Sequence, residues 1–82
     1  MADRVIAEER WSHVLFQRDS AYLLTFLSGG PVEVDHTIRL PEALALSVAH
    51  HPDQLGSLVE QCRGGSLPVG AEPYGSPAWP AA

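Results

Sequence analysis

The segment AYLLTFL, residues 21 to 27, limits the fold more strongly than any other part of the chain, because both of its faces are apolar. In an extended strand Leu23 points to one face, whereas Tyr22, Leu24 and Phe26 point to the other. A strand in a sheet covered on one side only would alternate apolar and polar residues. We therefore expect this strand to lie in a sheet that has a covering layer on each face.

The chain from residue 4 to residue 40 reads as strands rich in β-branched and aromatic residues. The predicted strands are RVIAEE, SHVLFQR, AYLLTFLS and VEVDHTIRL. The separators RDS and SGGP are typical of hairpin turns. The boundary ERWS contains neither Gly nor Pro, so residues 4–18 form either two strands or one long bent strand.

After residue 40 the apolar spacing becomes helical. Pro41 suits the first position of a helix that runs to about His50. Pro52 starts a second helix, which Gly64 ends. The fold class is therefore α+β: a three- or four-stranded antiparallel meander followed by two short C-terminal helices and a disordered tail.

The domain boundary is predicted at residue 63. Residues 1–63 form a single α+β domain, and residues 64–82 form a disordered tail that holds most of the prolines and glycines. Within this tail, Tyr74 and Trp79 are the two side chains large enough to dock as isolated anchors.

The loop between the third and fourth strands leaves two registers open. With a two-residue Gly-Gly turn, Leu23 lies opposite His36, and with a Gly-Gly-Pro loop Leu24 does. In both registers large apolar side chains share a face with the polar residues of the fourth strand. The residues predicted to bind a partner on this face are Leu15, Tyr22, Leu24, Phe26, Glu33, Asp35, Thr37 and Arg39.

This apolar face needs a cover. Exposing each large side chain costs about 1.5–3 kcal/mol, which is a large part of the roughly 5–10 kcal/mol that stabilises a small domain. The cover is internal, from the N-terminal segment or the tail, or external, from a second copy of the chain or a different protein.

Composition excludes several classes of function. Ten carboxylates oppose five arginines, for a formal net charge of −5, so we expect no nucleic-acid partner. The single cysteine excludes an internal disulfide and a multi-thiolate metal site. No apolar run is long enough to span a membrane, and the N-terminus is charged, which predicts a cytoplasmic protein. The lack of lysine is typical of a GC-rich bacterial genome.

The sequence evidence for catalytic residues is weak. Asp35 and His36 are neighbours in a strand and point to opposite faces, so they form no dyad. His13, Phe26 and Glu33 fall in one row if both hairpins have two-residue turns, but two strand spacings separate the acid from the imidazole by about 10 Å. No enzyme motif is present, and we predict no catalytic residue, cofactor or metal.

The leading hypothesis is a small acidic, non-catalytic protein-binding module of the inhibitor, immunity or accessory type. Its apolar sheet face, rimmed by carboxylates, would dock a protein partner, with a basic protein as the best match. The first alternative is a homodimer that serves a structural or ligand-binding role. The second is a small metal-dependent enzyme that uses His13 and His36.

Overall fold

Strand β3 (Ala21–Leu27) is the middle strand of a five-stranded antiparallel sheet in the computed structural model, which describes residues 3–28, 31 and 33–81. The other strands are β1 (Arg4–Glu9), β2 (His13–Arg18), β4 (Asp35–Leu40) and the short β5 (Glu72–Pro73). They are ordered β1-β2-β3-β4-β5. The expected antiparallel α+β meander is confirmed, but the described part of the sheet has five strands instead of three or four.

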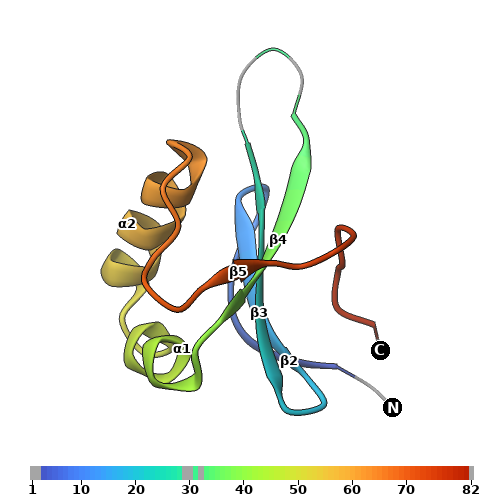
Figure 1. Ribbon diagram of the computed structural model, residues 1–82, viewed down its shortest axis with the longest axis vertical. Helices are drawn as coiled ribbons and strands as arrows, with labels where there is room; N and C mark the ends of the chain where they lie inside the picture. The colour runs from blue at the N-terminus through green and yellow to red at the C-terminus, as the bar shows by residue number, and fades with distance from the viewer. Residues whose placement is uncertain (1–2, 29–30, 32, 82) are drawn as a thin grey trace.

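Two helices, α1 (Glu42–Val48) and α2 (Pro52–Arg63), pack on one face of the sheet (Figure 1). Pro52 begins α2 as predicted, and the backbone N–H of Gly64 caps its end by donating to the Glu60 carbonyl. Helix α1 ends earlier than expected, at Val48. Helix α2 buries its predicted apolar stripe of Leu55, Leu58, Val59 and Cys62.

The C-terminal segment covers the other face of the sheet. After α2 the chain returns past Pro41, where Gly70 lies so close that a Cβ atom would meet the proline Cγ at 2.8 Å. It then pairs β5 with β4 and crosses the sheet opposite the helices (Figure 1). Residues 74–81, here called the strap, therefore belong to the fold. The prediction of a disordered tail is wrong for the described residues, because this segment completes the core.

Both faces of β3 are buried, as its sequence predicts. Tyr22, Leu24 and Phe26 lie in the core under the helices. Leu23 lies on the opposite face in a second cluster with Val14 and Phe16, against which the strap packs Ala78. We call the two sides of the sheet the helix face and the strap face.

The register between β3 and β4 is neither of the two expected. Phe26 lies opposite His36 and Leu24 opposite Ile38, because β4 begins at Asp35 and a longer loop precedes it. The two glycines of the predicted turn, at residues 29 and 30, lie outside the described residues. The observed pairing places the same side chains on each face as the Gly-Gly-Pro alternative does, so Tyr22, Leu24 and Phe26 share a face with His36.

Residues 4–18 form two strands, not one. The chain turns between β1 and β2 at Trp11, whose φ of 65° is left-handed, and it turns between β2 and β3 at Asp19, with a φ of 55°. Aspartate adopts this region readily, whereas a bulky residue seldom does. The β1–β2 hairpin thus uses Trp11 where a glycine would be expected.

Candidate functional site

Half of the predicted partner-binding set lies on the wrong face of the sheet for that role. Leu15, Tyr22, Leu24 and Phe26 are buried under the helices in the main core, at 8% exposure or less. The observed register sends them to the helix face, away from the acidic residues of β4. The prediction that they line an open face is therefore corrected.

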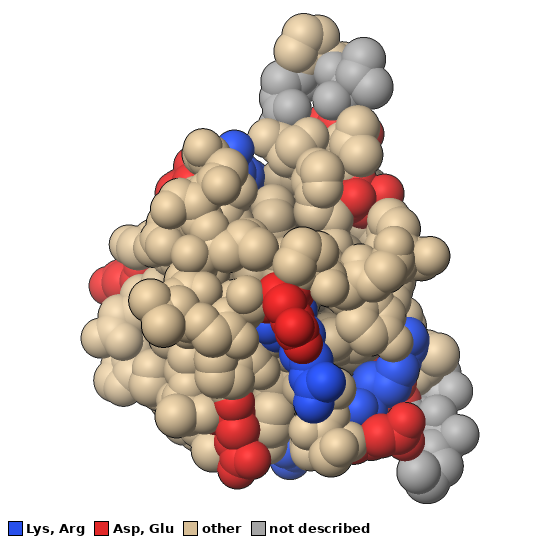
Figure 2. Space-filling model, in the orientation of Figure 1, with Lys and Arg blue, Asp and Glu red and all other residues tan. Residues whose placement is uncertain are grey.

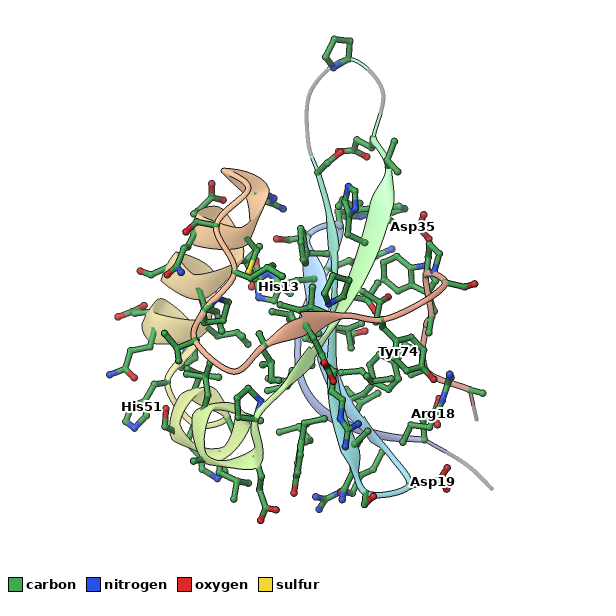
Figure 3. All side chains as sticks on the ribbon, in the orientation of Figure 1. His13, Arg18, Asp19, Asp35, His51 and Tyr74 are labelled. Carbon is green, nitrogen blue, oxygen red and sulfur yellow. The ribbon has the colours of Figure 1, made fainter. Side chains whose placement is uncertain are left out.

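The other half divides between the strap face and solvent. Thr37 is buried beneath the strap, and the Asp35 carboxylate accepts a hydrogen bond from the indole Nε1 of Trp79 at 2.8 Å. Figure 3 shows Asp35 on the side of the sheet that carries the strap. Glu33 and Arg39 are exposed. The chain itself, through its strap, covers the apolar face that the predicted acidic border was expected to surround.

Two threonines hold the middle of the strap. Thr25 and Thr37 lie opposite each other on β3 and β4, with their hydroxyl oxygens 2.7 Å apart. Ala78 donates its backbone N–H to the Thr37 hydroxyl at 2.9 Å, and its carbonyl accepts from the Thr25 hydroxyl. The hydrogen bond between the two hydroxyls closes a ring of hydrogen bonds among the three residues.

An ion pair holds the end of the strap. The Asp3 carboxylate accepts from Arg18 Nη2 at 2.8 Å and from the backbone N–H of Ala81 at 2.9 Å. The Asp3 N–H donates in turn to the Ala81 carbonyl at 3.0 Å. Hydrogen bonds from Arg18, followed by the Ala81 amide, lower the pKa of Asp3 to about 2. Hydrogen bonds with Asp3 and Tyr74 raise the pKa of Arg18, so both partners stay charged at neutral pH.

The strap leaves one end of its face uncovered. There, beside the β1–β2 turn, a groove of about 440 Å³ is bounded by Glu8, Trp11, Val14, Leu27 and Trp79. We call it the tryptophan groove; Glu9, Arg10, Ser12 and His13 also line it. Strand pairing sets Glu8 opposite Val14, on the strap face, and Leu27 lies on the same face by alternation. The groove thus combines apolar strand residues, a carboxylate and two indoles.

Trp11 is the most unusual residue of the groove. Its side chain is 81% exposed, although tryptophan is normally well buried, and its backbone is left-handed. The guanidinium of Arg10 lies 5.5 Å from the centre of its ring. Trp79 is 45% exposed and is oriented by its bond to Asp35. The sequence signal for Trp11 was its place in ERWS, a strand boundary without Gly or Pro.

The histidines of the enzyme hypothesis have structural partners. Arg63 donates to the Ser12 hydroxyl at 3.1 Å, and this hydroxyl lies 2.8 Å from His13 Nδ1. Burial lowers the pKa of His13, whose ring lies between the sheet and the helices (Figure 3). His36 stacks on Phe26 with the ring centres 5.6 Å apart. His13, Phe26 and His36 form the row across three strands, so the predicted row that ended in Glu33 is wrong.

A second groove runs beside β4, with His36, Cys62, Arg63 and Tyr74 among its walls. Burial raises the pKa of the Cys62 thiol, which disfavours the reactive thiolate. Arg63 donates its Nε–H to the Leu27 carbonyl at 2.7 Å and so ties α2 to the sheet. Among the described residues, no three His, Cys, Asp or Glu side chains lie close enough together to hold a metal ion.

Charged side chains of both signs are mixed over the face seen in Figure 2. Within residues 3–28, 31 and 33–81, no helix has the length and apolar character needed to cross a membrane.

Comparison of the chain with protein-family models, with curated proteins and with solved structures gave no match. The functional argument therefore rests on the geometry of the site.

Proposed function

We propose that this protein is a non-catalytic protein-binding module that docks its partner at the tryptophan groove. The exposed indole of Trp11 carries this proposal. A left-handed backbone costs a residue other than glycine roughly 1–2 kcal/mol, and the side chain recovers little of that cost by burial within the chain. Tryptophan is also one of the residue types enriched among the anchors of protein interfaces.

The groove shares no residue with the partner-binding set predicted from the sequence, so the proposal keeps the predicted class of function and assigns it to a different surface. The sequence predicts an apolar surface rimmed by carboxylates. The strap occupies the centre of that surface, and the tryptophan groove lies at its end, lined by Glu8 and by Trp79, whose indole donates to Asp35. A homodimer formed through the whole sheet face is disfavoured, because Val14 and Leu23 are already buried by the chain itself.

A capture experiment with matched variants tests the proposal. Trp11→Gly removes the indole and suits the left-handed backbone. Val69→Ala is the control, because Val69 is 98% exposed and lies outside the groove. A specific partner that is captured from the native host by the wild type and by V69A, but not by W11G, supports the groove as the interface.

Two outcomes contradict the proposal. A partner captured equally well by W11G would place the interface elsewhere. A dimer that survives dilution in sedimentation and is lost in W11G would assign the groove to a second copy of the chain, which is the homodimer alternative.

A further inference from the structure

The tryptophan groove has the chemistry of a site for a flat cation. The face of an indole attracts cations, and it also stacks well on planar groups. Trp11 and Trp79 supply two such faces. Glu8 supplies a carboxylate on the same side of the sheet, since strand pairing sets it opposite Val14.

The protein already shows that the Trp11 ring accepts a guanidinium. The Arg10 guanidinium lies over this ring at 5.5 Å from its centre. Arg10 itself lines the groove, so a guanidinium from a partner would stack on the other face of Trp11 or on Trp79. The contact between Arg10 and Trp11 therefore indicates that an external ligand would bring a guanidinium group.

The charges around the groove favour a cationic ligand. Glu8 and Glu9 both border it, and the chain carries a formal charge of −5. Arg10 is the opposing charge. His13 also borders the groove, and burial disfavours its charged form, so it adds little repulsion at neutral pH.

We infer that the partner presents an arginine side chain to the tryptophan groove. The guanidinium would stack on the indole of Trp11 or Trp79, and its N–H groups would donate to the Glu8 carboxylate. Arginine fits this arrangement better than lysine, because its planar fork can stack and bind a carboxylate in a bidentate manner at the same time, whereas an ammonium is compact and more strongly hydrated. This inference rests on the proposed function.

The test uses three short peptides that differ only in their central residue: arginine, lysine or citrulline. Citrulline keeps the shape of arginine and removes its charge. The peptides are titrated into the full chain, and the NMR signals of the Trp11 and Trp79 indole N–H groups are followed. We expect the arginine peptide to shift both signals and to bind at least about tenfold more tightly than the citrulline peptide, since stacked and charge-assisted contacts are lost together.

Two variants locate the contacts. Glu8→Gln should weaken binding of the arginine peptide by about three- to fivefold, as expected for an exposed ion pair. Asp53→Gln is the matched control, because Asp53 is an exposed carboxylate on α2, outside the groove. Equal binding of the lysine or citrulline peptide, no shift of either indole signal, or equal effects of the two variants would overturn the inference.

The two proposals fail separately. If W11G loses the captured partner but the arginine peptide does not bind, the groove is an interface and arginine is the wrong ligand. If W11G keeps the partner, the interface itself is misplaced, whatever the peptide does.

Discussion

Replacing Thr37 by valine tests whether the strap is fastened as the structure shows. Valine has nearly the same shape as threonine, so packing beneath the strap is retained while the hydroxyl is removed. The Ala78 N–H then loses its 2.9 Å acceptor, and the Thr25 hydroxyl loses its 2.7 Å neighbour. Because the site is covered, water cannot readily replace them.

The expected cost follows from the group left without a partner. A buried polar group that loses its hydrogen bond costs about 1–3 kcal/mol, so we expect T37V to lower the free energy of unfolding by about 2 kcal/mol. For a domain of this size, that corresponds to a fall of roughly 10 °C in Tm. Urea denaturation and thermal melts measure both quantities.

Thr37→Ser is the matched control. It keeps the hydroxyl and removes one methyl group, which costs about 1 kcal/mol. We therefore expect T37S to be more stable than T37V, although T37V retains more apolar surface. Hydrogen exchange of the Ala78 amide should accelerate in T37V and change little in T37S. If T37V proves as stable as the wild type, the Thr25–Thr37–Ala78 ring does not hold the strap and the reasoning is refuted.

Three further predictions concern the turn, the ends of the strap and the link to α2. Trp11→Gly should change the free energy of unfolding by less than about 1 kcal/mol, because relief of the left-handed backbone offsets the loss of a mostly exposed ring; a large loss in urea denaturation would make Trp11 structural. Asp3 has a lowered pKa, so the stability that it contributes is complete above pH 4 and is lost as pH falls towards 2. D3N should therefore flatten the dependence of the free energy of unfolding on pH in this window. An unchanged dependence in D3N would contradict the ion pair. Arg63→Leu should lower stability by about 1–3 kcal/mol, since the Leu27 carbonyl loses its donor; equal stability in denaturant would show that the contact is unimportant.

The sequence was sufficient for the elements whose signals are local. The apolar stripe of α2 and the proline at its start predict a helix that the structure confirms, because each depends on spacing or on the geometry of a single residue. The requirement for two covering layers on β3 is also confirmed, since it follows from strand alternation alone.

The residues assigned to the open face were half wrong for a physical reason. Alternation puts Leu23 and Leu24 on opposite faces of β3, and Asp35 and His36 on opposite faces of β4. It does not say which of these side chains face the helices. That choice depends on the register, and the register depends on where β4 begins after its loop. The sequence suggested a strand from residue 32, whereas pairing in the described part of β4 begins at Asp35.

Trp11 was noted in the sequence only as part of an unusual strand boundary. Its role in the groove depends on Trp79, which lies far along the chain and is brought near by the strap. A local pattern cannot show such a pairing, because it holds no information on contacts between distant segments.

The sequence by itself determined a two-sided central strand, an antiparallel meander and a helical layer on one side. Only the tertiary structure decided that the other layer is the chain's own C-terminal segment. The reason is that the strap is held largely by its backbone groups, through Ala78 and Ala81, which any residue type except proline could supply. Backbone hydrogen bonds stabilise a fold without leaving a pattern in the side chains, so they become visible only when the chain is folded.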